Sequence, residues 1–450
     1  MNDRPDHDGR LRSFLPYLGI WMLALAARLL YLWQVKDSPM FGLLLGDASS
    51  YDAWARQIAD GDWLGKTVFY QAPLYPYFLG VTYSLFGSNM LAAKVVQAFI
   101  GASSCLLLAS TTRHWFSYRT GLLCGAVLAL YPAAIFADGL IQKSVLDIFL
   151  LSALLCVLSR SARSSGLTWS LAGGFILGCL ALTRENTLLF VPLIILWLLV
   201  RSYPRDETGQ LGSVRKPNSG HCDAGILPTN SSEFCPLRSP NGRRVFGQNI
   251  ASVAMFTLAL ACVLLPVAWR NWVVGDTFAL TTSQLGPNFY IGNHASADGT
   301  YAPLRWGHGH PSFERADATL LAEQSLGKQL NPGEVSRYWF HRAVEDIRAS
   351  PGRWFTLIGR KCLLLMNAAE IGDTEDQYTY SDWSWLLRIT GYLLHWGTLL
   401  PLAAAGLFIT WPRRNKLGLL CLLLAGYALS VVLFYVFARY RLPMICFLIP

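Results

Sequence analysis

Long apolar runs alternate with short polar connections along most of the chain. The first run, FLPYLGIWMLALAARLLYLW at 14–33, matches the roughly 20 residues that an α-helix needs to cross a membrane. It is longer than a signal-peptide core and no small-residue cleavage site follows it, so we interpret it as an uncleaved first span. Further runs lie at 73–111 (a span with room for a re-entrant piece), 117–137, 140–159, 169–183, 186–201, 249–270, 385–411, 417–437 and 443 onward.

This pattern predicts an all-α polytopic membrane protein with roughly 10 or more membrane helices. The composition agrees, since 53% of the residues are hydrophobic and 14% are charged, whereas soluble domains average about 25% charged residues. The net charge of +9 is attributed to loops that face anionic lipid, so no nucleic-acid partner is expected.

The basic connections identify one side of the membrane. Arg and Lys gather in 1–13, 112–119, 160–165, 201–248 and 412–416, and all five fall on one side if 73–111 crosses once. The positive-inside rule makes that side cytoplasmic.

The resulting organisation has six parts. They are a cytoplasmic N-terminus (1–13), an N-terminal membrane module (14–200) with a first external loop (34–72), a flexible cytoplasmic loop (201–248), a span (249–270), an external subdomain of mixed structure (271–384) with a helix over 334–349, and C-terminal membrane helices (385–450). Because the chain stops at Pro450, a few residues into an apolar run, we expect the last part to be truncated.

The first external loop places carboxylates at the mouth of the first span. In GDASSYDAWARQIADG, helical spacing puts Tyr51, Trp54 and Ile58 on one face. Asp47 precedes this helix, where an N-cap would lie. Two interpretations remain open for Asp47: a cap on an interfacial helix, or a carboxylate that acts as a general base.

Other polar residues are predicted on the same external side. Charges at the ends of spans often mark ligand pathways, although each cation could also snorkel or pair locally. Arginine suits phosphate because its planar fork donates two hydrogen bonds. The charged candidates are Lys143 in DGLIQK, Arg184 and Glu185 in TRENT, and Arg439 and Arg441 in FARYRLP.

Aromatic and amide side chains add to this set. Tyr70 and Tyr75 lie in FYQAPLYPYFLG, where Pro73 and Pro76 are expected to break any helix that enters the membrane. LGPNFYIGN, at 285–293, is predicted to be a polar loop. Its side chains that could hydrogen-bond a polar substrate are Asn288, Tyr290 and Asn293.

These stretches, in this order and together with NAAEIGD, resemble the bacterial membrane glycosyltransferases of the GT-C fold, nearest to the protein-O-mannosyltransferase and aminoarabinose-transferase-like group (family 39). The resemblance implies an enzyme of the bacterial inner membrane that takes a sugar from a polyprenyl-phosphate carrier at the periplasmic face. In such families an acidic residue of the first external loop is catalytic. Asp47 is the match, and Asp52 is a second acid.

The resemblance also implies roles for basic residues. Arg439 and Arg441 match residues that hold the carrier phosphate, and Arg184 and Lys143 are weaker matches. Glu370, in NAAEIGD, has no assigned role beyond substrate binding. Relatives often carry Lys or His before a PPL-like segment, where this chain has Gln71, so the phosphate contact there differs.

The implied chemistry is a single displacement at the anomeric carbon with inversion, in which Asp47 is the base and guanidinium groups stabilise the leaving phosphate. The expected partners are the bilayer, the donor, and an acceptor that is a protein, a lipid or a glycan. No cofactor and no metal ligand are assigned. Some relatives bind a divalent metal through paired acids, and such a metal is not expected here but stays open. The ten cysteines form no CxxC pair, and Cys222 and Cys235 near His221 do not favour a zinc site.

Two other functions stay open from the residues alone. One is a transporter or flippase of a lipid-linked or polar substrate, and the other is a membrane scaffold whose external segment binds a partner. Geometry separates them from the transferase, which needs Asp47, Arg184 and Arg439 on one cavity. A separation beyond about two helix diameters, roughly 20–24 Å, would remove that site.

Overall fold

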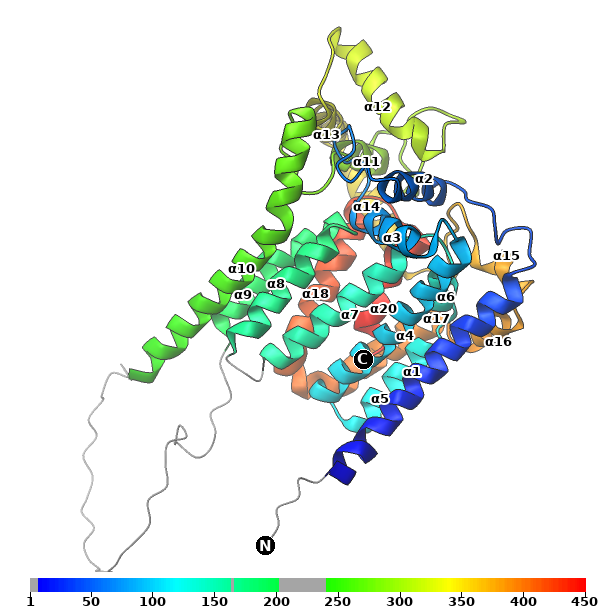
Figure 1. The fold of residues 1–450 in the computed structure, drawn as a ribbon. Helices are drawn as coiled ribbons and strands as arrows, with labels where there is room; N and C mark the ends of the chain where they lie inside the picture. Colours follow the sequence, from blue (N-terminus) through cyan, green and yellow to red (C-terminus); the bar gives the residue numbers. More distant parts are fainter. Residues whose placement is uncertain (1–6, 163–165, 202–239) are drawn as a thin grey trace, which may run out of the picture.

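The computed structural model describes residues 7–162, 166–201 and 240–450, and these form helices and loops without a strand. Most of the predicted loop 201–248, including His221, Cys222 and Cys235, lies outside the described residues. One set of helices runs side by side as a bundle (Figure 1). They are α1 (His7–Val35), α4 (Met90–Trp115), α5 (Tyr118–Ala129), α7 (Ser144–Ser161), α8 (Leu167–Ala181), α9 (Phe190–Val200), α10 (Pro240–Gly275), α17 (Trp396–Thr410) and α18 (Arg414–Leu433).

Several of these helices are suited to a membrane. Five segments are long and apolar enough to cross one: Leu15–Val35, Met90–Trp115, Ser144–Ser161, Gly247–Gly275 and Trp385–Thr410. A sixth consists of α5 and α6 (Pro132–Asp138), which are bent by 57° at their junction. Shorter apolar helices lie at Leu167–Ala181, Glu185–Val200 and Leu417–Leu433. The predicted all-α, polytopic membrane class is confirmed.

Small residues let these helices pack closely. A Cβ on Gly174 of α8 would lie 2.0 Å from the backbone oxygen of Phe256 on α10. A Cβ on Gly101 of α4 would meet the buried ion pair between Arg28 Nε and Asp138 Oδ2, which lie 2.5 Å apart. Close backbone approach at glycine is the usual way in which membrane helices associate.

A second set of helices gathers at one end of the bundle, which we call the site end (Figure 1). α2 and α3 pack against each other, as do α11 and α13. The helices of the site end are α2 (Asp47–Ala59), α3 (Leu74–Phe86), α11 (Leu285–Asn293), α12 (Pro311–Leu326), α13 (Pro332–Ala349), α14 (Pro351–Met366), α15 (Gln377–Ser381) and α16 (Trp385–Leu393). Short elements connect or follow the bundle helices. Between α8 and α9 lies η1 (Glu185–Leu189), after α17 lies η2 (Trp411–Arg413), and after α18 lie α19 (Ala438–Arg441), η3 (Leu442–Met444) and α20 (Ile445–Leu448).

The site end confirms some local predictions and corrects two. The helices expected after Gly46 and over 334–349 are present as α2 and α13. The segment 285–293 is helix α11 and not a loop, because its glycines fit against the chain: a Cβ on Gly286 would lie 1.8 Å from the oxygen of Ser336. Pro73 and Pro76 lie at the start of α3, where a missing N–H costs nothing, so they begin a helix and do not break one.

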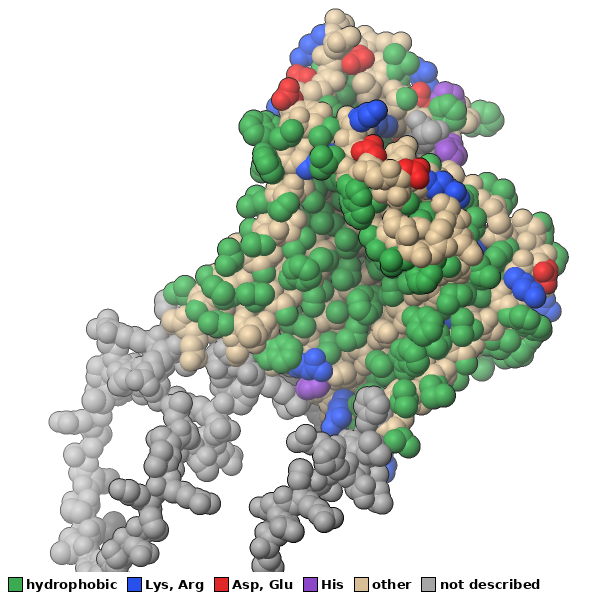
Figure 2. All heavy atoms as spheres, in the orientation of Figure 1, with side chains coloured by type: hydrophobic (Ala, Val, Ile, Leu, Met, Phe, Trp, Pro, Cys, Tyr) green, Lys and Arg blue, Asp and Glu red, His purple; other side chains and the backbone are tan. Residues whose placement is uncertain are grey.

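The described residues of the segment 271–384 form helices and loops. On the face drawn in Figure 2, hydrophobic side chains cover the middle of the bundle, and most acidic side chains lie toward α2 and α12. The opposite end carries Arg113 at the end of α4, Arg119 at the start of α5 and Arg160 at the end of α7. We call it the basic end.

Candidate active site

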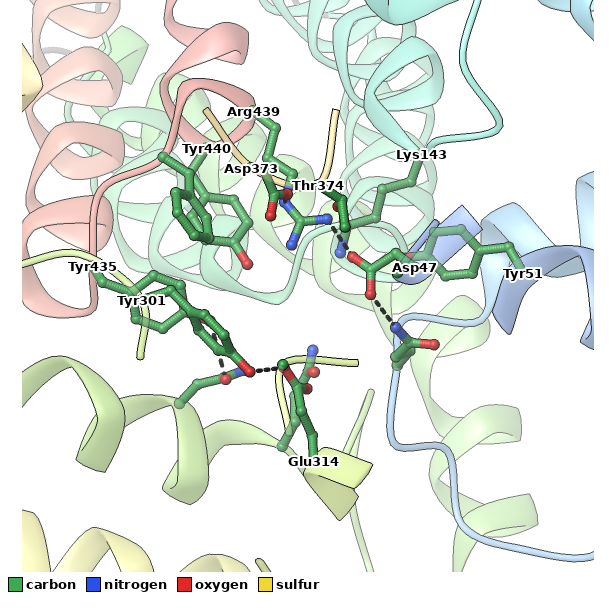
Figure 3. Close-up of a pocket in the computed structure, with 16 residues that line it drawn as sticks. Asp47, Tyr51, Lys143, Tyr301, Glu314, Asp373, Thr374, Tyr435, Arg439 and Tyr440 are labelled. Atoms are coloured by element: carbon green, nitrogen blue, oxygen red, sulfur yellow. Dashed lines mark hydrogen bonds and ion pairs between the residues drawn. The ribbon is translucent and has the colours of Figure 1, made fainter. Parts of the chain in front are cut away.

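A polar cavity of about 60 Å³ lies at the site end, and Asp47 points into it (Figure 3). Asp47 is the first residue of α2, and Gly46 before it has φ +53° and no room for a Cβ beside Thr374. The Asp47 side chain does not cap the helix. Its Oδ1 accepts a hydrogen bond from Gln71 Nε2 at 2.6 Å, and its Oδ2 pairs with Arg439. The cap interpretation of Asp47 is therefore wrong.

Arg439, in α19, joins two carboxylates. One guanidinium nitrogen pairs with Asp47, and Nε lies 2.7 Å from Oδ2 of Asp373. Asp373 comes from the loop before α15, so the guanidinium links three segments that are distant in sequence. Burial raises the pKa of Asp373, and the charge of Arg439 opposes that rise.

Arg184 helps to position Arg439. Its Nε pairs with Oδ2 of Asp147 at 2.7 Å, and its Nη2 donates a hydrogen bond to the backbone oxygen of Arg439 at 3.0 Å. Asp47, Arg439 and Arg184 are thus connected by direct contacts, so they lie within the distance limit set for the transferase, although Arg184 does not itself line the polar cavity.

A larger groove of about 550 Å³ adjoins the polar cavity. Arg184 and Glu185 line it together with apolar side chains of η1, α9, α11, α13 and α18, among them Leu189, Phe289, Phe340 and Val431. Lys143, Gln284, Asn288, Tyr435 and Tyr440 line both spaces. We call this space the apolar groove. Lys143 is buried at the junction, and no described acid forms an ion pair with it.

Glu314 and Tyr301 form another wall of the polar cavity (Figure 3). The Tyr301 hydroxyl donates a hydrogen bond to Glu314 Oε1. Burial raises the pKa of Glu314 to about 7, and the charges of Asp47 and Asp373 act in the same direction. The hydrogen bond from Tyr301 and the charge of Arg439 oppose this rise.

The structure brings half of the predicted residues to these two spaces. Tyr51, Lys143 and Asn288 line the polar cavity beside Asp47 and Arg439. In the groove, Glu185 Oε1 accepts hydrogen bonds from Thr282 at 2.8 Å and Gln284 at 2.9 Å. Tyr70 lies farther out, in a groove of about 580 Å³ beside α12 and α13, which we call the outer groove.

Other predicted residues lie outside both spaces. Asp52 accepts hydrogen bonds from Tyr83 at 2.6 Å and from Arg56 at 2.7 Å, and Tyr75 donates to Gln97 at 2.6 Å. These contacts fix α2 and α3 in place. The side chains of Tyr290 and Asn293 pack away from the cavity, since α11 is a helix. The Tyr290 ring lies 4.7 Å from that of Trp339, and Asn293 Oδ1 accepts from Trp354 Nε1 at 2.9 Å.

Arg441 and Glu370 form a separate pair. Arg441 is buried and donates to Glu370 Oε2 at 2.8 and 2.9 Å, and to the backbone oxygens of Asn367 and Ala369. Glu370 lines a neighbouring cavity of about 70 Å³, whereas Arg441 lines neither space of the site. Arg441 therefore holds the 367–370 loop in place, while Arg439, two residues earlier, faces the site.

Sequence reasoning missed several residues of the site. Asp373 is the last residue of NAAEIGD, Tyr440 lies within FARYRLP, and Tyr435 lies two residues before it. These three residues were therefore in or beside motifs that the sequence analysis had singled out. No motif pointed to Glu314 or Tyr301, because the segment 271–384 contains several other acids and tyrosines from which the sequence does not distinguish them. Among the described residues, no group of three or more His, Cys, Asp or Glu is placed to hold a metal ion.

Comparison with known proteins adds one family. Residues 70–209, about a third of the chain, match the family described as dolichyl-phosphate-mannose-protein mannosyltransferase. The predicted resemblance to this group of membrane glycosyltransferases is confirmed. The match includes Gln71, Lys143 and Arg184, whereas Asp47 and Arg439 lie outside it. No curated protein matches the chain.

Solved structures of low identity are also similar. They include the oligosaccharyltransferase AglB of Archaeoglobus fulgidus with an inhibitory peptide and a dolichol-phosphate (11% identity, 99% of this chain and 50% of that one, TM-score 0.49). Another is ArnT of Cupriavidus metallidurans bound to undecaprenyl phosphate (15% identity, 98% and 77%, TM-score 0.40). The chain spans about half the length of the archaeal oligosaccharyltransferase chains that it matches.

Proposed function

We propose that this protein is a membrane glycosyltransferase that moves a sugar from a polyprenyl-phosphate donor to an acceptor. The observation that carries the proposal is the contact between Asp47 and Arg439 in the polar cavity that adjoins the apolar groove. A lipid-linked sugar has an apolar chain, an anionic phosphate and a polar ring. The adjoining spaces offer an apolar channel, buried cations and a polar cavity in the same order.

The donor's phosphate would bind at the junction of the two spaces. Lys143 has no described counter-ion there, and Arg439 can offer a fork of N–H groups to phosphate oxygens. Arg184 positions Arg439 through its backbone and does not need to touch the phosphate itself. The isoprenoid chain would lie along Leu189, Phe289 and Val431 of the apolar groove.

Asp47 would act as the general base. When a phosphate competes for Arg439, the carboxylate of Asp47 is released to accept a proton from the acceptor. The acceptor oxygen forms a bond to the anomeric carbon as the bond from that carbon to the phosphate oxygen breaks. The electron pair stays on the phosphate, where Lys143 and Arg439 stabilise its charge. A single displacement of this kind inverts the anomeric centre.

The proposed location follows from charge. If the basic end is cytoplasmic, the site end and its cavity face the periplasm or exterior of a bacterial inner membrane. The domain limits predicted from the sequence belong to the same proposal, with the first external loop supplying Asp47 and the segment 271–384 closing the cavity.

The test is sugar transfer by the purified full chain in detergent, from a panel of polyprenyl-phosphate sugars, with release of lipid phosphate as the readout. Asp47→Asn should lower turnover by about 10²-fold or more, the usual contribution of a general base. Asp52→Asn is the matched control, since Asp52 lies on the same helix but outside the cavity, and it should stay within a few-fold of wild type. Normal turnover by an equally stable Asp47→Asn variant would remove the base role. Donor transport across vesicles without transfer would favour the flippase.

A further inference from the structure

The walls of the polar cavity differ in chemistry. Lys143 lines both the cavity and the apolar groove, and Arg439 lines the cavity, where its backbone oxygen accepts a hydrogen bond from Arg184 of that groove. Glu314 and Tyr301 line the cavity but not that groove, and no described basic side chain forms an ion pair with Glu314 (Figure 3). One side of the cavity is therefore suited to a phosphate, and the other would repel it.

Glu314 is held in a fixed orientation. Tyr301 donates to its Oε1, and the Tyr301 ring packs on Tyr435 and Phe437 with centroids 5.5 and 6.0 Å away. No described residue donates a hydrogen bond to Oε2 of Glu314. A carboxylate fixed through one oxygen, with the other available, is a hydrogen-bond acceptor for a ligand.

The geometry of a single displacement indicates which ligand Glu314 would contact. In a single displacement the nucleophile enters opposite the leaving phosphate, so an acceptor would approach from the side away from Lys143 and Arg439. We propose that Glu314 is an acceptor-binding residue, whose Oε2 accepts a hydrogen bond from a hydroxyl adjacent to the one that attacks. The acceptor would then be a polyol, with two neighbouring hydroxyls, one for Asp47 and one for Glu314. This inference rests on the proposed function.

The surroundings of Glu314 are consistent with a polar acceptor. Tyr301 and Glu314 also line a narrow neck with Tyr70, and Tyr70 in turn lines the outer groove. The outer groove carries charged and hydroxyl side chains, including Arg315 and Glu323, among its apolar ones. The neck has no room for water in this structure, so the side chains that form it must shift if an acceptor enters this way.

Ionisation of Glu314 gives the inference a pH dependence. With a pKa of about 7, Glu314 is mostly protonated at pH 6 and mostly ionised at pH 8, and the ionised form is the stronger acceptor. Preference for a polyol should therefore rise over this range. The titratable and charged groups that face or neighbour Glu314 are Tyr70, Tyr301, Tyr435, Asp47, Asp373, Lys143, Arg439, Arg315, His308 and Asp317.

The experiment measures acceptor choice by the full chain with a donor that it uses. Glycerol and 1-propanol are supplied together as probes, and the ratio of the two glycosides is measured from pH 6 to 8. The wild type should favour glycerol increasingly with pH. Glu314→Gln should lower the glycerol preference about three- to tenfold at pH 8, the range for one hydrogen bond, and flatten the pH dependence. The KM for the donor should stay within about twofold, and Tyr301→Phe should show a smaller decrease in preference.

Several outcomes would overturn the inference. An unchanged ratio in Glu314→Gln would do so, as would a weaker affinity for undecaprenyl phosphate, because that would place Glu314 on the donor side. Melting temperatures control for misfolding, and Glu314→Asp, which keeps the charge but shortens the reach, replaces a Gln variant that does not fold. If the wild type uses no donor and does not bind undecaprenyl phosphate, the proposed function itself fails, which is a separate result.

Discussion

At the scale of single residues, the site depends on one guanidinium shared between two acids. Arg439 contacts Asp47 with one nitrogen and Asp373 with another, and Arg184 holds its backbone. Two carboxylates this close would repel each other without the cation. Arg439 therefore both keeps the two acids together and, in the proposed reaction, meets the phosphate.

A lysine at position 439 should show whether the fork matters or only the charge. Arg439→Lys keeps the positive charge but cannot contact both carboxylates and a phosphate through a planar set of donors. We expect turnover to fall by more than about tenfold, equivalent to at least 1.4 kcal/mol, with release of lipid phosphate as the measurement. Arg441→Lys is the matched control, and its effect should appear as lower thermal stability. Equal turnover losses at equal stability would show that the position facing the cavity has no special role.

Glu314 should make stability depend on pH in a definite direction. Its folded pKa, about 7, lies above its ordinary 4.5, so the folded state binds this proton more tightly than the unfolded state does. The stabilisation is fully present below about pH 4.5 and is lost as pH rises through 7. The melting temperature of wild type minus that of Glu314→Gln should therefore fall between pH 5 and 8. Glu345→Gln, at an exposed position of α13, should show no such trend.

At the scale of elements, apolar runs predicted the bundle well because the membrane requires helices of a certain length. Prediction failed where tertiary contacts decide the structure. The glycines of LGPNFYIGN suggested a loop, yet they are needed because α11 passes close to Ser336 and Phe434. The same reason applies to the site. Asp47 and Arg439 lie in recognisable sequence motifs, whereas Glu314 lies in no such motif and reaches the cavity only through tertiary packing.

Close packing of α8 on α10 should be sensitive to a single methyl group. The Cβ of Gly174→Ala would lie 2.0 Å from the backbone oxygen of Phe256, so one helix must move. We expect a loss of about 1–3 kcal/mol of stability, the usual cost of overpacking, measured by thermal unfolding in detergent. Gly406→Ala in α17 is the control, because its Cβ meets nothing within 4 Å, and it should be neutral or stabilising by up to about 1 kcal/mol. Similar melting temperatures for both variants would contradict the close approach.

At the scale of the whole molecule, the bundle separates two chemistries. The site end carries the acids and the cavities, and the basic end carries Arg113, Arg119 and Arg160. The positive-inside rule could be applied to the sequence because it counts charges and needs no contacts. What it could not supply is the meeting of the apolar groove with the polar cavity, which requires α11, α13 and α18 to lie together.

This separation predicts which end of the bundle a reagent on each side of the membrane can reach. Ala295→Cys, exposed after α11 at the site end, should react with a membrane-impermeant maleimide in intact spheroplasts. Thr168→Cys, exposed at the start of α8 at the opposite end, should react only after permeabilisation. The parent chain, with its own cysteines, gives the background. Labelling of Thr168→Cys alone in intact spheroplasts would invert the topology and place Asp47 on the cytoplasmic side. The donor would then have to be one that presents its sugar there, because Lys143, Arg439 and Asp47 all open toward the same end of the bundle.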